Sequence, residues 1–333
     1  MKAVSIFNNK GGVGKTTLLC NIASSLSVHH GKSVLIIDAD PQCNATSYVL
    51  SNSEIEKIYK PRNPITINNL VDPYKKGKGR LPDELPLKRS PGFRVDIIIG
   101  DPRLALAEDF LARDWFEARA GEERGIRSTL FFLDILNRCD HYDYVIFDVG
   151  PSLGAINRSV LLASEFFMVP MASDIFSLQA LSNIRVALEE WKEDIENGIK
   201  RHNRRNEDSE YSNIDFREKA KFIGYVTQQY TAKVVEGVRV PVKAYEAIIR
   251  KIPSRVKTNL TAKFSKNVDF NPKIGEVPYL QSMVPLSQIA NKPIFLLKSS
   301  DGVVGSHFAK VREFDRFVKE LSGRFIENIE SQE

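Results

Sequence analysis

The stretch that decides the fold is Lys10-Gly11-Gly12-Val13-Gly14-Lys15-Thr16-Thr17, near the start of a chain of 333 residues. Its last part, Gly14-Lys15-Thr16, is typical of a phosphate-binding loop, in which backbone N–H groups and the following helix N-terminus surround phosphate oxygens. The usual pattern, G-x-x-x-x-G-K-[ST], would have a glycine in place of Asn9, and a second lysine, Lys10, stands at the mouth of the loop. The stretch predicts a nucleoside triphosphate site, and the alternative is a glycine-rich turn with chance lysines.

The flanking sequence supplies the strand and the helix that such a loop needs. Residues 4–7 are mostly apolar and indicate a short strand before the loop. Apolar residues after the loop recur at the spacing of one buried helix face, at Leu19, Ile22, Ala23 and Leu26. Further buried strands are predicted at 93–99, 166–169 and 222–227. We therefore expect an α/β fold with a mostly parallel, doubly wound sheet flanked by helices, of the phosphate-loop NTPase type and with insertions.

Two further apolar runs end in acidic residues. Residues 33–37 precede Asp38 and Asp40, whose side chains project to the same side because strand residues alternate. A second run, 144–147, ends at Asp148, where a Walker-B acid belongs. Ligands of parallel sheets lie at the carboxyl ends of the strands, and acids beside a triphosphate suit magnesium and a positioned water. The alternative is that these aspartates only cap strand ends or begin turns.

Three segments together carry a resemblance to a known family. They are Lys10–Thr17, Asp38-Ala39-Asp40-Pro41-Gln42-Cys43-Asn44-Ala45-Thr46 and Asp148-Val149-Gly150-Pro151-Ser152-Leu153-Gly154. The chain resembles the deviant Walker-A ATPases of the ParA/MinD class and is most similar to the ParA (Soj-like) partition ATPases. The resemblance extends over about 1–50, 93–103, 126–184, 222–230 and 276–296. The chain departs from the pattern at Cys43, where glycine is usual, at Gly150, where proline or alanine is usual, and through several insertions.

The resemblance implies ATP and Mg²⁺ as cofactors and gives the loop residues their roles. Lys15 would bind the β- and γ-phosphates, Thr16 would ligate magnesium, and Thr17 would contact the α-phosphate. Lys10, the signature lysine, would reach across a homodimer to the partner's nucleotide, so that hydrolysis depends on dimer formation. The residues expected around the phosphates are Gly11, Gly12, Val13, Gly14, Lys15, Thr16 and Thr17.

The same resemblance assigns the acids and the base contacts. Asp40 would orient the attacking water and act in catalysis together with Lys10 and Lys15. Asp38 and Asp148 would hold magnesium together with Thr16. The segment 277–280 resembles the stretch that cups adenine in the family. Base contacts are therefore expected at Pro278 and Gln228, with an ordinary loop as the alternative.

Length and composition favour one large α/β domain over two. We expect residues 1–333 to form a single ATPase domain with insertions at about 53–91, 104–124, 189–218 and 231–275. The first insertion predicts an exposed loop, the second a charged helix and the third a solvated helix with a loop. Residues 127–138 predict one helix beneath the strand that ends at Asp148. Cysteines at 20, 43 and 139 lack C-x-x-C spacing and indicate reduced thiols in a cytosolic protein.

Positive charge is clustered at 250–266, and a second, smaller cluster lies at 200–205, with Lys200, Arg201, Arg204 and Arg205. Lys and Arg number 47 against 42 Asp and Glu, a net charge of +5. Residues 250–266 contain no acidic side chain and six basic ones: Arg250, Lys251, Arg255, Lys257, Lys263 and Lys266. Such a stretch could contact DNA phosphates without sequence specificity, as ParA-like dimers do. The alternative is a solvated surface or a site for a partner protein.

The sequence predicts no contact with a membrane. It has no run of 18 apolar residues. The apolar positions in 308–325 predict an amphipathic helix, but acidic residues follow it where a MinD-like protein would carry a basic tail. We therefore expect this helix to pack on the body of the protein. The location expected is cytoplasmic, and nucleoid-associated if the protein binds DNA.

Two functions remain open at this point. The first is an ATP-hydrolysing dimerisation switch that binds DNA in its ATP state and moves a plasmid or chromosome region with a ParB-like adaptor. The second is a ParA-like regulatory ATPase switch whose ATP-bound dimer recruits a protein partner, with DNA binding incidental. ATP-dependent binding to DNA would separate them.

Overall fold

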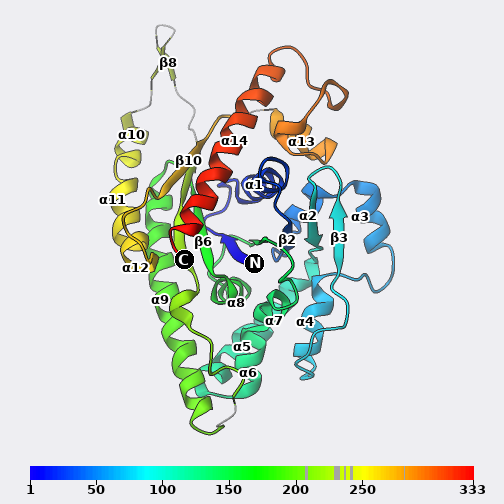
Figure 1. Ribbon diagram of the computed structural model, residues 1–333, viewed down its shortest axis with the longest axis vertical. Coiled ribbons are helices and arrows are strands. Elements are labelled where there is room, and N and C mark those ends of the chain that lie inside the picture. The colour runs from blue at the N-terminus through cyan, green and yellow to red at the C-terminus, as the bar shows by residue number, and fades with distance from the viewer. Residues whose placement is uncertain (207–208, 229–232, 236–237, 241–242, 281) are drawn as a thin grey trace.

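The computed structural model describes residues 1–206, 209–228, 233–235, 238–240, 243–280 and 282–333. Its centre is an eight-stranded sheet in the order β10-β7-β6-β1-β5-β2-β4-β3 (Figure 1). Among the described strand pairs of this sheet, β3 and β4 are antiparallel and the others are parallel. The strands are β1 (Lys2–Ile6), β2 (Val34–Asp38), β3 (Leu87–Ser90), β4 (Val95–Ile98), β5 (Tyr144–Asp148), β6 (Phe166–Met171), β7 (Lys221–Gln228) and β10 (Lys273–Val277). The predicted fold class is confirmed.

Helices cover both faces of this sheet. One face packs against α1 (Lys15–His30), α2 (Asn44–Val49) and α14 (His307–Glu330), and Figure 1 shows α14 crossing beside α1. The other face packs against α4 (Ile67–Lys75), α5 (Ala107–Ala120), α6 (Glu123–Thr129), α7 (Phe131–Leu136), α8 (Ala155–Ala163), α9 (Ile175–Asn203) and α11 (Ile252–Val256). Further elements are α3 (Asn52–Tyr59), α10 (Lys243–Ile249), α12 (Ala262–Phe264), α13 (Met283–Ala290) and a separate antiparallel pair, β8 (Lys233–Val235) and β9 (Val238–Val240).

The alternation of strand residues explains how one sheet serves two cores. In β5, Val145 and Phe147 belong to the core under α7 and α8, whereas Tyr144 and Ile146 belong to the core under α1 and α14. All five residues of β5 and of β2 are buried. Continuous apolar strands are therefore needed, because each residue faces one helical layer or the other.

The segment 53–91 is not the exposed loop that its prolines predicted. It contains most of α3, all of α4 and the edge strand β3. The reason lies in α4, where Ile67, Leu70, Val71 and Tyr74 recur at helical spacing and are each 2% exposed or less. Pro73 is accommodated late in this helix. The burial of one apolar face therefore outweighs the local turn signals.

Two helix predictions need correction. Residues 127–138 do not form one helix, because α6 ends at Thr129, and Leu130 precedes α7 with a backbone outside the helical region. The segment from 189 is the second half of α9 and is not merely solvated, because Trp191, Ile195 and Ile199 are buried in the core. The helix predicted at 104–124 is confirmed as α5, and the packed amphipathic helix as α14.

The division of the chain into one domain with four insertions stays a prediction. Strand β10 begins at Lys273 and pairs with β7, so the last residues of the proposed 231–275 segment belong to the sheet edge. Residues 207–208, 231–232, 236–237 and 241–242 of the proposed insertions lie outside the described residues. Within the described ranges, no helix is long and apolar enough to cross a bilayer.

Candidate functional site

The predicted phosphate loop connects β1 to α1 at the centre of the sheet. Gly12 and Gly14 have φ angles of 73° and 68°, in the left-handed region that glycine adopts without strain. A Cβ on Gly14 would also lie 2.3 Å from Nε2 of Gln228. The loop lines a cavity of about 520 Å³ that Asp40, Asn44 and Pro151 also line. This geometry leaves backbone N–H groups at the start of α1 facing an open, polar space.

Lys15 lies at the base of the loop and is 8% exposed. Its Nζ donates to the backbone oxygens of Asn8 and Lys10, at 3.2 and 3.3 Å. Burial lowers the pKa of this lysine, and the nearby Asp148 and Asp40 act in the opposite direction. Within the described part of the chain, the hydrogen bonds of this ammonium group go to neutral acceptors, and an anionic ligand would be its first strong hydrogen-bond partner.

Asp38 and Asp148 are paired across neighbouring strands and are fully buried. Thr16 donates its hydroxyl to Oδ2 of Asp148 at 2.8 Å. Asp38 Oδ2 accepts from the backbone N and the hydroxyl of Thr46, at 2.8 and 2.7 Å. Oδ1 of each aspartate is buried without a hydrogen-bond partner among the described residues. Two orphaned carboxylate oxygens beside a hydroxyl form an oxygen donor set of the kind that suits Mg²⁺.

The electrostatics of this pair favour a bound cation. Burial raises the pKa of Asp38 to about 7, and burial together with the charge of Asp38 raises the pKa of Asp148 well above its ordinary value. In the described part of the chain, no three His, Cys, Asp or Glu side chains could hold a metal ion by themselves. The residues therefore fit a cation that completes its shell with phosphate oxygens and water.

The raised pKa values predict how stability depends on pH. At Asp38 and Asp148, the folded state binds more protons than the unfolded state between the ordinary Asp pKa of 3.8 and about 7. This contribution to stability is complete below pH 3.8 and is lost as the pH rises towards 7. Asp148→Asn keeps an acceptor for Thr16 and removes one of the charges. In metal-free buffer, the Tm difference between this variant and the wild type should be roughly 2–4 °C more positive at about pH 7.5 than at about pH 5. The same Tm difference at both pH values would contradict the raised pKa values of the pair.

Asp40 is 5% exposed and lies beside the loop cavity. Its Oδ1 accepts from the backbone N of Gln42 at 3.0 Å, which fixes the direction of the carboxylate. A Cβ on Gly150 would lie 3.4 Å from the same oxygen, so glycine here leaves more room around Asp40 than alanine or proline would. Asp40 stays the predicted residue for orienting water.

Lys10 has an intramolecular partner that the sequence did not reveal. Its Nζ forms an ion pair with Oδ2 of Asp174. The other oxygen of Asp174 accepts from the backbone N of Phe176 and Ser177 at 2.9 and 3.0 Å, and so caps α9. Burial alone would raise the pKa of Asp174, but the hydrogen bond from Lys10 and these backbone bonds lower it. Ser173-Asp174 before an apolar helix is a pattern that predicts a helix cap, although it does not predict the ion pair with Lys10.

A second cavity, of about 320 Å³, adjoins the loop at Val13, Gly14 and Thr17. Gln228 and Pro278 both line it, so the two residues predicted to contact adenine are brought together. Gln228 Nε2 donates to the backbone oxygen of Val13 at 2.6 Å and so ties β7 to the loop. Phe314 of α14 also lines the cavity. The sequence identified Phe314 only as an apolar helix position, because no local pattern links it to the loop.

The six basic residues at 250–266 are exposed, but half of them have partners in space. Arg250 lies 3.9 Å from Glu246, Lys263 lies 3.7 Å from Glu189, and Lys266 donates to the backbone oxygen of Glu333. The remaining three, Lys251, Arg255 and Lys257, have no ion pair with any described residue. Figure 1 shows α10, α11 and α12 one after another along one side of the molecule, near α9. The stretch has fewer free charges than its sequence suggests.

Comparison with protein families matches residues 1–201 to the AAA_31 family, described as an AAA domain. A curated relative is the chromosome-partitioning ATPase Soj of Thermus thermophilus. It is 30% identical over 190 residues, which are 57% of this chain and 62% of the relative. The matches to the curated relatives of this kind span about three fifths of their length.

Solved structures share the fold. Protein DIP2308 from Corynebacterium diphtheriae is 29% identical with a TM-score of 0.72, over 87% of this chain and 97% of that one. Cobyrinic acid a,c-diamide synthase from Mycobacterium smegmatis, with bound ADP and magnesium, is 19% identical with a TM-score of 0.52, over 77% and 82%.

The pNOB8 ParA structure bound to nonspecific DNA is 18% identical with a TM-score of 0.58, over 100% and 99%. At these identities, the likeness to the synthase and to pNOB8 ParA shows the fold alone. The family match, in contrast, covers more than half of the chain. The chain therefore belongs to the AAA_31 family of AAA domains, and within that family it resembles the ParA-type partition ATPases.

Proposed function

We propose that this protein is a ParA-type ATPase switch. It binds Mg²⁺–ATP at the phosphate loop, dimerises around the nucleotide and hydrolyses it slowly. In its ATP state it binds DNA without sequence preference, and it acts in plasmid or chromosome partition with a ParB-like adaptor, in the cytoplasm and on the nucleoid. The observation that carries the proposal is the loop itself: Lys15 lies at its base near Asp148, and Thr16 donates to Asp148 of the buried pair of Asp38 and Asp148.

The nucleotide part of the proposal rests on the two adjoining cavities. The triphosphate would lie in the loop cavity with Lys15, and the base would lie between Gln228 and Pro278. Thr16, Asp38 and Asp148 would hold magnesium, which supplies charge neutralisation at the phosphates when bound. Asp40 would accept a hydrogen bond from water and orient it towards the γ-phosphate. ADP and magnesium in the cobyrinic acid a,c-diamide synthase support this choice of cofactors.

The dimer part rests on the surface around Lys10. Ile175 and Phe176 follow Asp174 directly and are 49% and 65% exposed. Exposed large apolar side chains that follow a residue bound to the phosphate loop favour a protein contact there. A second copy of the chain that covers them would approach the ion pair of Lys10 and Asp174. The lysine could then exchange its carboxylate for the partner's nucleotide.

The DNA part predicts an ATP-gated, salt-dependent affinity. With a slowly hydrolysed ATP analogue, the protein should bind random duplex DNA, and the affinity should fall steeply with salt. Changing Lys251, Arg255 and Lys257 together to Glu should weaken binding by about 100-fold or more at low salt, because phosphate contacts are lost in both subunits. Fluorescence anisotropy of a labelled duplex measures this.

The matched control changes three other exposed cations, Lys57, Lys60 and Arg62, to Glu. It alters the net charge equally and should bind DNA nearly as the wild type does. If the first triple variant binds like this control, the free cations near residue 255 are not the DNA surface.

The regulatory switch remains the second candidate, and one observation favours it. Three of the six basic side chains at 250–266 are already engaged with carboxylates or a backbone oxygen. This weakens the attraction of the surface for a polyanion. If the wild-type protein binds no DNA when locked in its ATP state, a protein partner for the ATP-bound dimer becomes the better assignment.

A further inference from the structure

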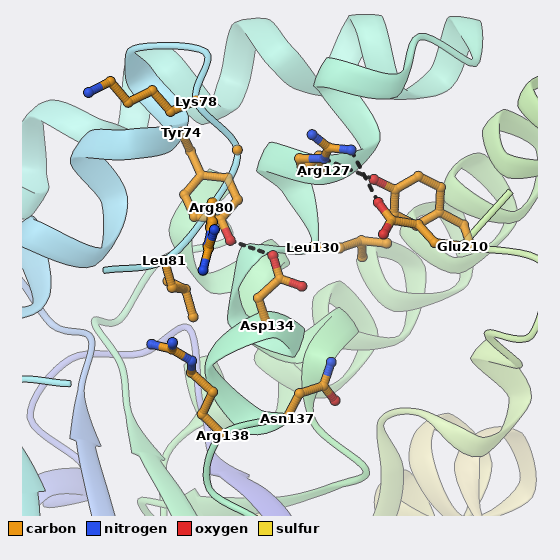
Figure 2. A pocket seen from close by; sticks show the side chains of 12 residues that line it. Tyr74, Lys78, Arg80, Leu81, Arg127, Leu130, Asp134, Asn137, Arg138 and Glu210 are labelled. Atoms are coloured by element: carbon orange, nitrogen blue, oxygen red, sulfur yellow. Dashed lines mark hydrogen bonds and ion pairs between the residues drawn. The ribbon is translucent and has the colours of Figure 1, made fainter. Parts of the chain in front are cut away.

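A third cavity, of about 450 Å³, lies outside the nucleotide site and shares no residue with it. It is formed by the end of α4 with the loop that follows, by α6 and α7, and by residues 210–211 (Figure 2). Two of these segments belong to the proposed insertions. The phosphate loop and the base cavity make no use of this space, so its residues are not explained by ATP.

The floor of the cavity is apolar and well packed. Tyr74, Leu81, Leu130 and Tyr211 are each 7% exposed or less. The loop after α4 closes over Arg127 at Gly79, which has a φ of 57° and where a Cβ would lie 2.5 Å from Cδ of Arg127. The wall is therefore held by specific contacts. A volume of this size is in the range of small-molecule sites.

The charges around the cavity are unequal. Four cationic side chains line it, against the carboxylates of Asp134 and Glu210: Lys78, Arg80, Arg127 and Arg138. Arg127 is neutralised, because it pairs with Glu123 and lies 3.2 Å from Glu210. Arg138 donates one N–H to the backbone oxygen of Pro82 and pairs with no described carboxylate. The excess positive charge therefore lies on the Arg138 side of the cavity, away from Arg127.

Arg80 and Lys78 add to that excess. Arg80 lies 3.8 Å from Asp83, but both side chains are more than 80% exposed, so this pair is worth little. Lys78 forms no ion pair with a described residue. Figure 2 shows Asp134 in the middle of the view, between the Arg80 and Arg138 side and the Arg127 and Glu210 side. Two planar guanidinium groups with unused N–H donors can each bind two oxygens of a tetrahedral phosphate group.

The other side of the cavity offers unused polar groups of a different kind. Tyr74 donates its hydroxyl to Oδ2 of Asp134, and Oδ1 of Asp134 receives no donor from a described residue. Asn137 also lines the cavity, and its amide forms no hydrogen bond with a described side chain or backbone. A carboxylate oxygen and an amide next to aromatic and aliphatic walls suit a flat ring that carries N–H donors.

We propose that this cavity binds a phosphorylated small molecule with the chemistry of a nucleoside monophosphate. Its phosphate lies at Arg80 and Arg138, and its base lies against Tyr74 with ring donors towards Asp134 and Asn137. The site is separate from the ATP site, so the proposal does not depend on ATP hydrolysis. The chain would then have a second small-molecule site, formed by segments that do not contribute to the ATP site.

The test is isothermal titration calorimetry on the full chain saturated with a non-hydrolysable ATP analogue and Mg²⁺, which occupies the phosphate loop. The probes are GMP, AMP, guanosine and ribose 5-phosphate. At least one nucleotide should bind once per chain, and both the phosphate-free and the base-free probe should bind about tenfold more weakly or worse. Arg80→Glu, at an exposed position, should weaken nucleotide binding by about tenfold.

Two further variants separate the parts of the site. Arg80→Glu with Arg138→Glu should abolish measurable binding, and Asp134→Asn should weaken the nucleotide but leave ribose 5-phosphate unchanged. Arg62→Glu, an exposed arginine outside the cavity, is the matched control and should bind as the wild type does. Melting curves of each variant identify any loss of fold, and Arg80→Glu decides the result if the double variant unfolds.

Three outcomes would overturn the proposal. No probe binds at millimolar concentration, or binding disappears once the ATP analogue saturates the protein, or Arg80→Glu binds like Arg62→Glu. If only a random DNA duplex is bound and Arg80→Glu abolishes that binding, the cavity contacts nucleic-acid backbone and the small-molecule assignment is wrong.

Discussion

Lys15→Ala is expected to weaken ATP binding by about 100-fold or more, because charge-assisted contacts to two phosphates are lost in a poorly solvated site. The lysine is nearly buried, and among the described residues its Nζ donates only to the neutral oxygens of Asn8 and Lys10. It therefore keeps its charge available for the ligand. Titration with a fluorescent ATP analogue in the presence of Mg²⁺ measures the change in Kd.

The matched control for this experiment is Lys60→Ala, which removes an exposed lysine outside the loop. It should bind ATP as the wild type does. Lys15→Ala leaves two backbone oxygens without a donor, so its Tm should be measured as well. An unchanged Kd for Lys15→Ala would remove the loop from nucleotide binding and with it the whole proposed function.

Lys10→Ala is expected to reduce ATP turnover by about 1,000-fold while leaving ATP affinity within a few fold of wild type. A cation supplied by a partner subunit at the transferring phosphate has effects of roughly this size. The Lys10 backbone oxygen, which accepts from Lys15, is unaffected by this change. Steady-state phosphate release and light scattering with a slowly hydrolysed analogue separate turnover from dimer formation.

Asp174→Asn is the matched variant for the same experiment. It keeps an acceptor for the α9 cap but weakens the ion pair that holds Lys10 within its own chain. Its ATP-bound dimer should form at lower protein concentration than that of the wild type. Normal turnover by Lys10→Ala would be incompatible with a lysine acting across the dimer.

The parts of the site that the sequence predicted are those held by short local patterns. Gly14, Lys15 and Thr16 are fixed by the junction of one strand and one helix, and Asp38 and Asp148 by the ends of buried strands. Their proximity follows from the rule that parallel strands end at one edge. The site roles themselves stay predictions until the variants above are measured.

The features that the sequence did not reveal come from distant segments. Asp174 lies 164 positions from Lys10, and no spacing rule connects them. The pairing of Lys263 with Glu189 likewise depends on the packing of residues 252–261 beside α9. In the segment 53–91 the prolines and glycines signal turns locally, whereas the burial of the α4 face is a tertiary effect that the local pattern does not contain.

The central position of β1 has a consequence for how the protein is made. Asn8, at the end of this strand, donates its side-chain amide to the backbone oxygen of Pro170, which is 162 positions later in the chain. At translation rates of about 5–20 residues per second, β6 is synthesised roughly 8–30 s after β1. The phosphate loop therefore leaves the ribosome well before its framework closes, because the Pro170 acceptor follows Asn8 by 162 positions. Until then an apolar strand with open edges is exposed, which makes the nascent chain a natural client for chaperones.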